Sequence, residues 1–338
     1  MDKTVLEWDA RTGAVLSAHG LPIEFVYSIA FSPNTKHTAV AHRDETIQLW
    51  DLGAGDLGPA LEGHTDDVVR LAYSPCGKWI ASASKDKTVR LWEPENTEQG
   101  HVLANMDCGT FSNSTVTFSP IGQQLAAGDV DGTVNIFDTQ SKTLFRTTTL
   151  EGERISALAY SPNGQELAIG ASGFLFFWDL QSKEPNLKLE VDPNGVSCIV
   201  YSPCERWIAC GSYVNTVQLC GRYSSGMGAE CVVAVVDGFL GLVTDIAWNP
   251  VEPLEFVTGS NDRSVRVWRI SKSDVSDGVA SVDLIWGSDI GMLGTFGMIL
   301  EGVTGLDATN RKLLLQRDAV DDSLTSEEDE AEVGSSCD

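Results

Sequence analysis

The segment Lys87–Trp92 (KTVRLW) decides the fold, because variants of it recur along the whole chain. The related segments are KTVLEW at 3–8, ETIQLW at 45–50, GTVNIF at 132–137, GFLFFW at 173–178, NTVQLC at 215–220 and RSVRVW at 263–268. Their last residues lie 42, 42, 45, 41, 42 and 48 residues apart. Most of them alternate apolar and polar residues, which is the pattern of a half-buried strand. The chain is therefore predicted to be an array of similar strand-rich units.

A second motif recurs in phase with the first, because an aromatic residue followed by Ser-Pro or Asn-Pro precedes six of these segments by 18 to 20 residues. The copies are Phe31-Ser32-Pro33, Tyr73-Ser74-Pro75, Phe118-Ser119-Pro120, Tyr160-Ser161-Pro162, Tyr201-Ser202-Pro203 and Trp248-Asn249-Pro250. Within one unit, the pattern predicts a strand ending at Tyr73, a turn over 75–77, a strand over 79–84, a tight turn over 85–87 and a strand over 88–92. A fourth, outer strand would precede the next unit. Each unit is thus expected to be a four-stranded antiparallel sheet.

A period of about 40–45 residues that ends in Trp-Asp is typical of propeller blades. On these motifs the chain resembles the WD-repeat β-propeller family over nearly its whole length. The resemblance implies an all-β fold: a single seven-bladed β-propeller over residues 1–317, followed by a tail over 318–338. Radial stacking buries both faces of each sheet, which no single sheet can achieve alone.

The resemblance also implies a His–Ser/Thr–Asp–Trp hydrogen-bond chain in each blade. Only the second blade matches it completely, and the other blades match it in part. The complete set is His64, Ser82, Asp86 and Trp92; the partial sets are Asp44 and Trp50 in the first blade, Asp131 in the third, Trp178 in the fourth, and Thr258, Asp262 and Trp268 in the sixth. The sixth blade has Phe239 near the His position, and the fifth has Val214 and Cys220 in place of Asp and Trp. His64 is interpreted as a satisfied buried polar group rather than a catalyst.

The two ends of the chain are expected to meet in a split seventh blade. Residues 2–5 (DKTV) match 86–89 (DKTV), so the N-terminus would supply the outer two strands. Residues 303–318 (VTGLDATNRKLLLQRD) resemble a degenerate copy of the first and second strands of a repeat and would supply the inner two strands. The alternative is a helix over 308–317 capped by Asp307, because periodicity does not assign the run 313–315. Residues 279–286 are expected to form the outer strand of the sixth blade, and 290–300 an apolar insertion.

Charge narrows the classes of partner. The 338 residues carry a formal charge of −25, which argues against direct nucleic-acid binding and against binding to anionic membranes. Residues 318–338 hold nine acids and no Lys or Arg, so this acidic tail is expected to be disordered. No stretch reaches the ~18 apolar residues of a membrane span, and residues 1–13 do not resemble a signal peptide.

Neither catalytic chemistry nor a cofactor is indicated. The sequence has no HExxH, GxSxG, GxGxxG or phosphate-binding GxxxxGK[ST] motif, so we expect a protein that is not an enzyme and has no cofactor. Five of the eight cysteines fall in the fifth blade, at 198, 204, 210, 220 and 231. They occupy different strands and a turn, with no CxxC spacing, and are interpreted as small core residues rather than metal ligands. Unpatterned cysteines favour a reducing compartment, the cytoplasm or the nucleus.

The surface remains as the candidate site. In the WD-repeat family, partners usually bind the face that carries the turn Asp residues, here called the turn-Asp face. The residues expected to bind a partner there are Phe25, Tyr27, Arg43, Arg70, Lys85, Arg154, Asp245 and Asn261. This set is rich in cations for so acidic a chain, and Arg and aromatic residues are common interface anchors. We therefore predict a non-catalytic scaffold that binds other proteins or peptides as part of a multiprotein complex.

Two other functions stay open. Residues 302–319 (GVTGLDATNRKLLLQRDA) resemble the end of fungal proteins that join a NACHT-type ATPase to a C-terminal propeller. That resemblance implies a sensing domain, although this chain has no ATPase motif of its own. An enzyme that uses the central channel is the other alternative.

Overall fold

The computed structural model describes residues 4–20, 26–34, 37–51, 56–94, 101–105, 115–185, 187–221, 231–274 and 279–288. Every regular element in these ranges is a β-strand, which confirms the all-β class. The described part contains no helix long and apolar enough to cross a membrane. The predicted apolar insertion at 290–300, the inner strands or helix at 303–317 and the acidic tail at 318–338 lie outside the described residues.

The strands form six four-stranded antiparallel sheets and one two-stranded sheet. The two-stranded sheet holds β1 (Thr4–Trp8) and β2 (Val15–Gly20). The first three blades hold β3 (Val26–Phe31), β4 (His37–His42), β5 (Ile47–Asp51) and β6 (Asp56–Leu61); β7 (Val68–Tyr73), β8 (Ile80–Ser84), β9 (Thr88–Trp92) and β10 (His101–Asn105); β11 (Thr115–Phe118), β12 (Gln124–Gly128), β13 (Thr133–Asp138) and β14 (Thr143–Thr149). The next three hold β15 (Ile155–Tyr160), β16 (Glu166–Ala171), β17 (Phe174–Asp179) and β18 (Leu187–Glu190); β19 (Val196–Tyr201), β20 (Trp207–Ser212), β21 (Val217–Gly221) and β22 (Cys231–Val236); β23 (Val243–Trp248), β24 (Glu255–Ser260), β25 (Val265–Asp274) and β26 (Val279–Gly287).

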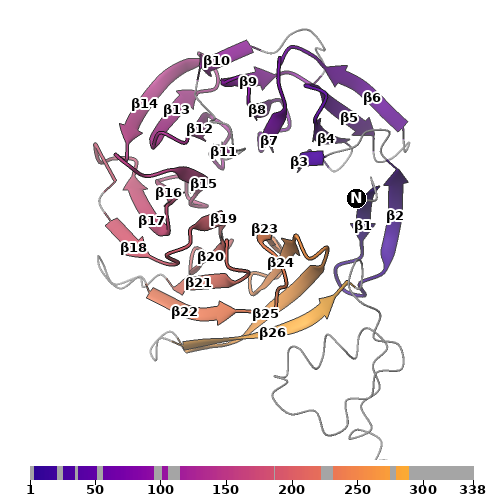
Figure 1. Cartoon of the computed structure of the whole chain (residues 1–338), viewed down its shortest axis with the longest axis vertical. Coiled ribbons are helices and arrows are strands. Elements are labelled where there is room, and N and C mark those ends of the chain that lie inside the picture. The colour runs from indigo at the N-terminus through magenta and orange to yellow at the C-terminus, as the bar shows by residue number, and fades with distance from the viewer. Residues whose placement is uncertain are drawn as a thin grey trace, which may run out of the picture.

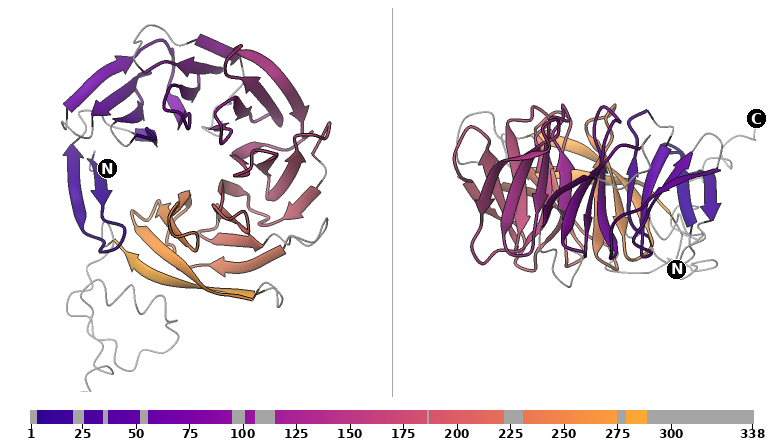
Figure 2. Two further views of the ribbon diagram at one scale, coloured as in Figure 1. Left: turned by 180° about the vertical axis from the view of Figure 1, so that it is seen from behind. Right: turned by 90° about the horizontal axis from the view of Figure 1, so that it is seen from above.

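The sheets stand around one axis in chain order (Figure 1). The first strand of each four-stranded blade lies nearest the axis and the fourth lies at the rim. Seen from the side, the ring is a disc in which the strands run between two faces (Figure 2). The turns between second and third strands therefore gather on the turn-Asp face. The turns between first and second strands gather on the opposite face, here called the Ser-Pro face.

Local sequence explains both kinds of turn. In the Ser-Pro turn, the Ser74 hydroxyl accepts a hydrogen bond from the Trp79 amide at 2.9 Å, and Ser119, Ser161 and Ser202 act in the same way. On the turn-Asp face, the last residue of the turn adopts a left-handed conformation, with φ of 70° at Lys87, which follows the turn Asp, and 95° at Gly173, which follows Ser172. A Cβ on Gly173 would lie 2.3 Å from the Asp192 carbonyl oxygen, so only glycine fits there.

The core is divided among the seams between neighbouring blades. Five hydrophobic clusters occupy the five seams that join the first to the sixth blade. The third-strand tryptophans Trp92, Trp178 and Trp268 are fully buried in these clusters or at their edges. Apolar burial between sheets thus stabilises the ring even where the hydrogen-bonded tetrad is incomplete.

The outer strand predicted for the sixth blade is confirmed, because β26 pairs with β25 over 266–274 and 279–287. The β1–β2 hairpin occupies the gap in the ring between the sixth and first blades (Figure 1). It lies where the two outer strands of the split seventh blade are expected.

Candidate interaction surface

The second blade links its four matching side chains in one hydrogen-bonded chain. The indole Nε1–H of Trp92 donates to the Ser82 hydroxyl at 2.8 Å, and Ser82 lies 2.6 Å from Nε2 of His64. Nδ1 of His64 lies 2.7 Å from the Asp86 carboxylate. Because an ionised carboxylate only accepts, Nδ1–H donates to Asp86 and Nε2 accepts the proton of Ser82. The chain therefore holds the loop before the blade against its central turn.

The pKa shifts of His64 and Asp86 agree with these hydrogen-bond directions. Burial lowers the pKa of His64, an effect that the neighbouring Asp86 only partly offsets. Burial opposes ionisation of Asp86, yet hydrogen bonds from His64 and Thr88 hold the pKa of that carboxyl well below its usual range. A neutral imidazole with an ionised carboxylate is the state that both shifts favour. The polar side chains of the tetrad thus hydrogen-bond to one another and stabilise the blade.

The sixth blade replaces the histidine by another device. Phe239 lies 5.7 Å from Trp268 between ring centroids, much as His64 lies 5.6 Å from Trp92. The hydrogen-bond donor that His64 places beside Asp86 is replaced here by Arg266, whose Nη2 lies 2.9 Å from the Asp262 carboxylate. Arg266 is only 2% exposed and its guanidinium stacks over Phe239 at 4.4 Å. Trp268 still donates to the Thr258 hydroxyl at 3.0 Å.

The first, third and fourth blades have only individual hydrogen bonds at the positions of the tetrad or beside them. In the first, Asp44 accepts a hydrogen bond from the Thr46 hydroxyl at 2.7 Å. In the third, the turn is capped by buried Asp129, which accepts from the amides of Asp131 and Thr133, whereas Asp131 itself is exposed. In the fourth, Trp178 donates to the Ser182 carbonyl at 3.3 Å.

The fifth blade lacks the turn Asp and the third-strand Trp, and other residues occupy its core. The Ser212 hydroxyl donates to Asp192 at 2.6 Å, a contact supplied by the preceding loop. Cys210 and Cys220 pack in the seam with the fourth blade, and Cys198 packs in the seam with the sixth. Burial raises the pKa of the Cys198 thiol to about 12. Over the ranges that the structure describes, no group of His, Cys, Asp and Glu is arranged to hold a metal ion.

On the turn-Asp face, the first and second blades bring three predicted residues together. Asp67 accepts hydrogen bonds from the Tyr27 hydroxyl and from Nζ of Lys85, each at 2.8 Å. Nζ of Lys85 also lies 5.2 Å from the centre of the Tyr27 ring. Burial opposes ionisation of Asp67, but the Lys85 and Tyr27 hydrogen bonds and the charge of Arg43 lower its pKa. Within this cluster the Asp67 carboxylate is paired with Lys85.

Arg70 and Arg154 lie near a second set of titratable side chains, which includes Tyr213. Burial raises the pKa of Tyr213, and the positive charges of Arg70 and Arg154 act against that rise. Burial also raises the pKa of Asp245, which Arg70 partly offsets. Although Asp245 is exposed at the inner strand of the sixth blade, the surrounding protein still disfavours its charged form. Residues from the second, fourth, fifth and sixth blades thus share one electrostatic environment.

The structure does not unite all the predicted partner-binding residues. Asn261 is exposed on the turn of the sixth blade, where its amide donates to the Leu242 carbonyl at 2.8 Å. No contact joins its side chain to the Lys85 cluster within the described ranges. Phe25 lies outside the described residues.

With the ring and its surface described, the class of protein follows: a β-propeller whose blades carry the Ser-Pro turn, the turn Asp and the third-strand Trp. The chain belongs to the WD-repeat β-propeller family. Residues 25–221 match the family described as the IFT122 first beta-propeller, and residues 231–269 match the WD domain, G-beta repeat.

Several curated relatives share part of the chain. It is 28% identical over 178 residues to the periodic tryptophan protein 2 homolog of Dictyostelium discoideum, an alignment that covers 51% of this chain and 18% of the relative. It is 25% identical over 173 residues to the WD repeat-containing protein 91 homolog of the same organism, covering 49% and 22%. It is 25% identical over 193 residues to the human echinoderm microtubule-associated protein-like 2, covering 56% and 23%. The chain thus spans about a fifth of the length of these relatives.

Sequence reasoning missed three residues that act in this framework. Asp129, two positions before Asp131, takes the capping role in the third blade. Asp192 and Arg266 substitute for tetrad members from other positions. One sequence signal pointed to Arg266. It holds the same position of the repeated segment as Arg90, in the sixth blade, which lacks the tetrad His. A groove on the Ser-Pro face was also missed.

Proposed function

We propose that this propeller is a non-catalytic scaffold that binds a partner protein or peptide on the turn-Asp face. Propellers of the WD-repeat family generally serve as protein-interaction scaffolds and are typically not enzymes. The observation that carries the choice of face is the environment shared by Arg70, Arg154 and Tyr213 across the ring. Neither guanidinium forms a salt bridge with a described residue.

An acidic segment is the partner chemistry that this face favours. Among the described residues, Lys85 pairs with Asp67, whereas Arg70 and Arg154 form no salt bridge and Arg70 lies near Asp245. Burial already disfavours the ionised form of Asp245. A carboxylate or phosphate from a partner would complete the charge balance, and Tyr213, 41% exposed, would supply an aromatic contact.

The experiment uses the full chain and a fluorescent peptide of alternating Glu and Tyr. Arg70→Glu/Arg154→Glu should weaken binding at least tenfold at low salt. The matched control Lys183→Glu/Arg206→Glu changes the same charge at exposed positions toward the Ser-Pro face and should leave affinity within twofold. Equal loss in both double variants would mean that net charge alone drives binding and would overturn the choice of face.

We also propose that the ring has seven blades and that residues 303–317 supply the inner strands of the seventh. Phe31, the aromatic residue of the first Ser-Pro motif, is 57% exposed, whereas Phe118, Tyr160 and Tyr201 at the same position are buried against the preceding blade. An inner strand beside β1 would cover Phe31. Deleting residues 1–18 would then open the ring and expose strand edges, causing aggregation or a large fall in melting temperature. A deletion variant that stays monomeric with unchanged melting would contradict the split blade.

Three further expectations remain proposals. A reducing, cytoplasmic location is supported by the free thiols of Cys76, Cys198, Cys204, Cys210 and Cys220. The alternative function, a sensing domain related to NACHT-type ATPases, rests on residues 302–319, which lie outside the described part of the chain.

The tail at 318–338 is proposed to compete weakly for the cationic surface. A 1–317 truncation should then bind the acidic peptide more tightly at low salt, with a gap that closes as salt rises.

A further inference from the structure

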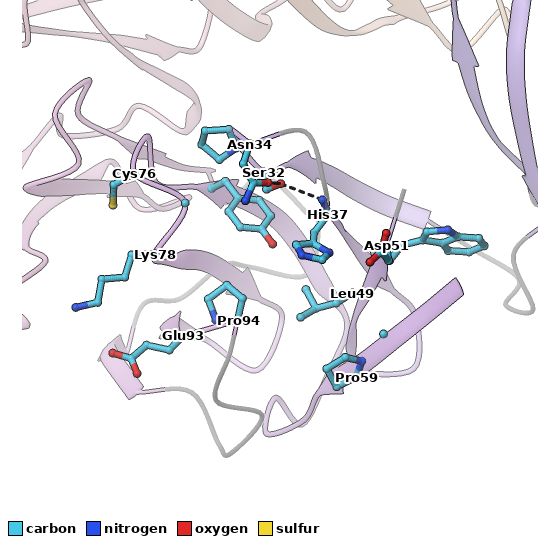
Figure 3. Close-up of a pocket in the computed structure, with 15 residues that line it drawn as sticks. Ser32, Asn34, His37, Leu49, Asp51, Pro59, Cys76, Lys78, Glu93 and Pro94 are labelled. Atoms are coloured by element: carbon cyan, nitrogen blue, oxygen red, sulfur yellow. Dashed lines mark hydrogen bonds between the residues drawn. The ribbon is translucent and has the colours of Figure 1, made fainter. Parts of the chain in front are cut away.

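The Ser-Pro face carries a groove at the seam between the first and second blades. Its volume is about 850 Å³, within the usual range for pockets that bind ligands. Its walls are the Ser-Pro turns of both blades and the ends of β5 and β9. In Figure 3, His37, Leu49, Pro59 and Pro94 surround the open space, while Lys78 extends away from it.

Comparison of the repeats explains why the groove lies at this seam. The first residue after each Ser-Pro turn projects toward the aromatic residue of the next blade. At the second–third and fifth–sixth seams this residue is Trp79 or Trp207, and each packs into the cluster of its seam. At the third–fourth and fourth–fifth seams it is Gln124 or Glu166. These accept hydrogen bonds from the Tyr160 hydroxyl at 3.5 Å and from the Tyr201 hydroxyl at 2.7 Å.

The first seam has neither kind of closure. Its residue is His37, too small to fill the seam as Trp does, and the imidazole makes no hydrogen bond to a described residue. Tyr73, the aromatic partner, is half-buried, whereas Tyr160 and Tyr201 are 7% and 6% exposed. The Tyr73 hydroxyl has no hydrogen-bond partner in the described part of the chain. Burial raises the pKa of this hydroxyl to about 12, so it stays a protonated donor.

Charge at the rim indicates the sign of a ligand. Asp51 ends β5 and Glu93 directly follows β9, and the two side chains lie on opposite sides of the space (Figure 3). Lys78, the lysine among the described residues that line the groove, is turned toward the Trp79 ring, whose centre lies 4.8 Å from its Nζ. The chain as a whole carries −25 charges. A cationic segment is therefore attracted to this rim, and an acidic one is repelled.

We propose that this groove binds a short basic peptide segment of a partner protein, which inserts one aromatic side chain between the first and second blades. The inserted ring takes the place that Trp79 and Trp207 fill at their own seams. It packs against Leu49 and Tyr73, and Lys or Arg residues beside it pair with Asp51 and Glu93. The site is on the face opposite to the proposed acidic-partner surface and does not depend on it.

The test uses the full chain and fluorescent Lys-Trp-Lys, Lys-Ala-Lys and Glu-Trp-Glu peptides, capped at both ends, at physiological salt. Lys-Trp-Lys should bind saturably and at least tenfold more tightly than either other peptide. His37→Trp should close the seam from within and weaken Lys-Trp-Lys binding at least tenfold. The matched control is Ile121→Trp, which places a Trp at an exposed turn position on the same face and should leave the affinity unchanged.

A second variant keeps the proposal testable if His37→Trp fails to fold by circular dichroism. Asp51→Asn/Glu93→Gln should weaken Lys-Trp-Lys binding severalfold, with a shallower salt dependence than the original chain. Equal affinities for Lys-Trp-Lys and Lys-Ala-Lys would overturn the proposal, because charge alone would then account for binding. Unchanged affinity in either groove variant, or no saturable binding to the original chain, would overturn it as well.

Discussion

Trp286 of β26 stacks on Trp8 of β1, with ring centroids 5.9 Å apart and planes inclined by 26°. Its indole Nε1–H also donates to the carbonyl of Ala10 at 2.7 Å, a contact between residues 276 positions apart. Gly13 in the hairpin turn has φ of 70°, and a Cβ there would lie 3.2 Å from the Trp286 ring. The rim of the sixth blade therefore anchors the N-terminal hairpin.

Trp286→Ala should release this hairpin. Removing a buried indole costs about 3–5 kcal/mol of unfolding free energy in general, and part of that loss should appear locally as fraying of residues 4–20. Hydrogen exchange measured by mass spectrometry should rise in this segment first. Trp178→Ala, on the far side of the ring, is the control and should not loosen residues 4–20 selectively. Equal exchange of the hairpin in both variants would contradict the anchoring role.

The second blade should be better protected than the fifth. Its tetrad joins a loop, two strands and a turn by hydrogen bonds, whereas the fifth blade has Cys220 in place of the third-strand Trp. Amides of β21 should therefore exchange faster than those of β9. Trp92→Ala should destabilise the protein by ~3–5 kcal/mol and bring β9 toward the exchange rates of β21. Equal protection of the two strands in the unmodified protein would be the opposite result.

Acidification should weaken the second blade. Because the pKa of folded His64 lies below its ordinary value of 6.5, the unfolded chain binds the extra proton first, and stability falls as pH drops below that value. The lowered pKa of Asp86 acts in the same direction at still lower pH, below its ordinary value of 3.8. Arg90, which also faces His64, lowers its pKa further.

The measurement is the unfolding free energy between pH 7 and pH 5. One group can contribute a slope of at most ~1.4 kcal/mol per pH unit. His64→Gln should remove its share, although His42, whose pKa burial also lowers, keeps a dependence of the same sign. His42→Gln is thus the matched variant, and the double variant should be nearly insensitive to pH above 5. An identical slope in His64→Gln and the original chain would show that His64 is not held neutral.

In the sixth blade, Arg266 and Asp262 should behave as one unit. Each is almost completely buried, so Asp262→Asn alone leaves an uncompensated guanidinium and should cost about 3–5 kcal/mol. Adding Arg266→Met removes that charge, and the double variant should be more stable than Asp262→Asn alone. Denaturant unfolding of the four proteins in this cycle measures the coupling. Additive losses would mean that the pair does not interact.

The periodic sequence determined most of the fold, because each blade repeats the same strand, turn and Trp signals. The outer strand at 279–286 and the outer hairpin of 4–20 followed from the repeat, since strand pairing in a meander is local. The complete tetrad at His64, Ser82, Asp86 and Trp92 could be located by carrying the pattern of the WD-repeat family over to the second repeat.

The packing of the blades, which no single repeat specifies, sets how the incomplete blades are held and where a groove remains. Asp129, Asp192 and Arg266 act because packing brings them to a vacant position, and no spacing rule specifies such a substitution. Whether His37 closes its seam depends on the reach of one side chain toward Tyr73 in the next blade. Sequence names both residues, but their separation is set by how two sheets stack, which is a property of the ring and not of either repeat.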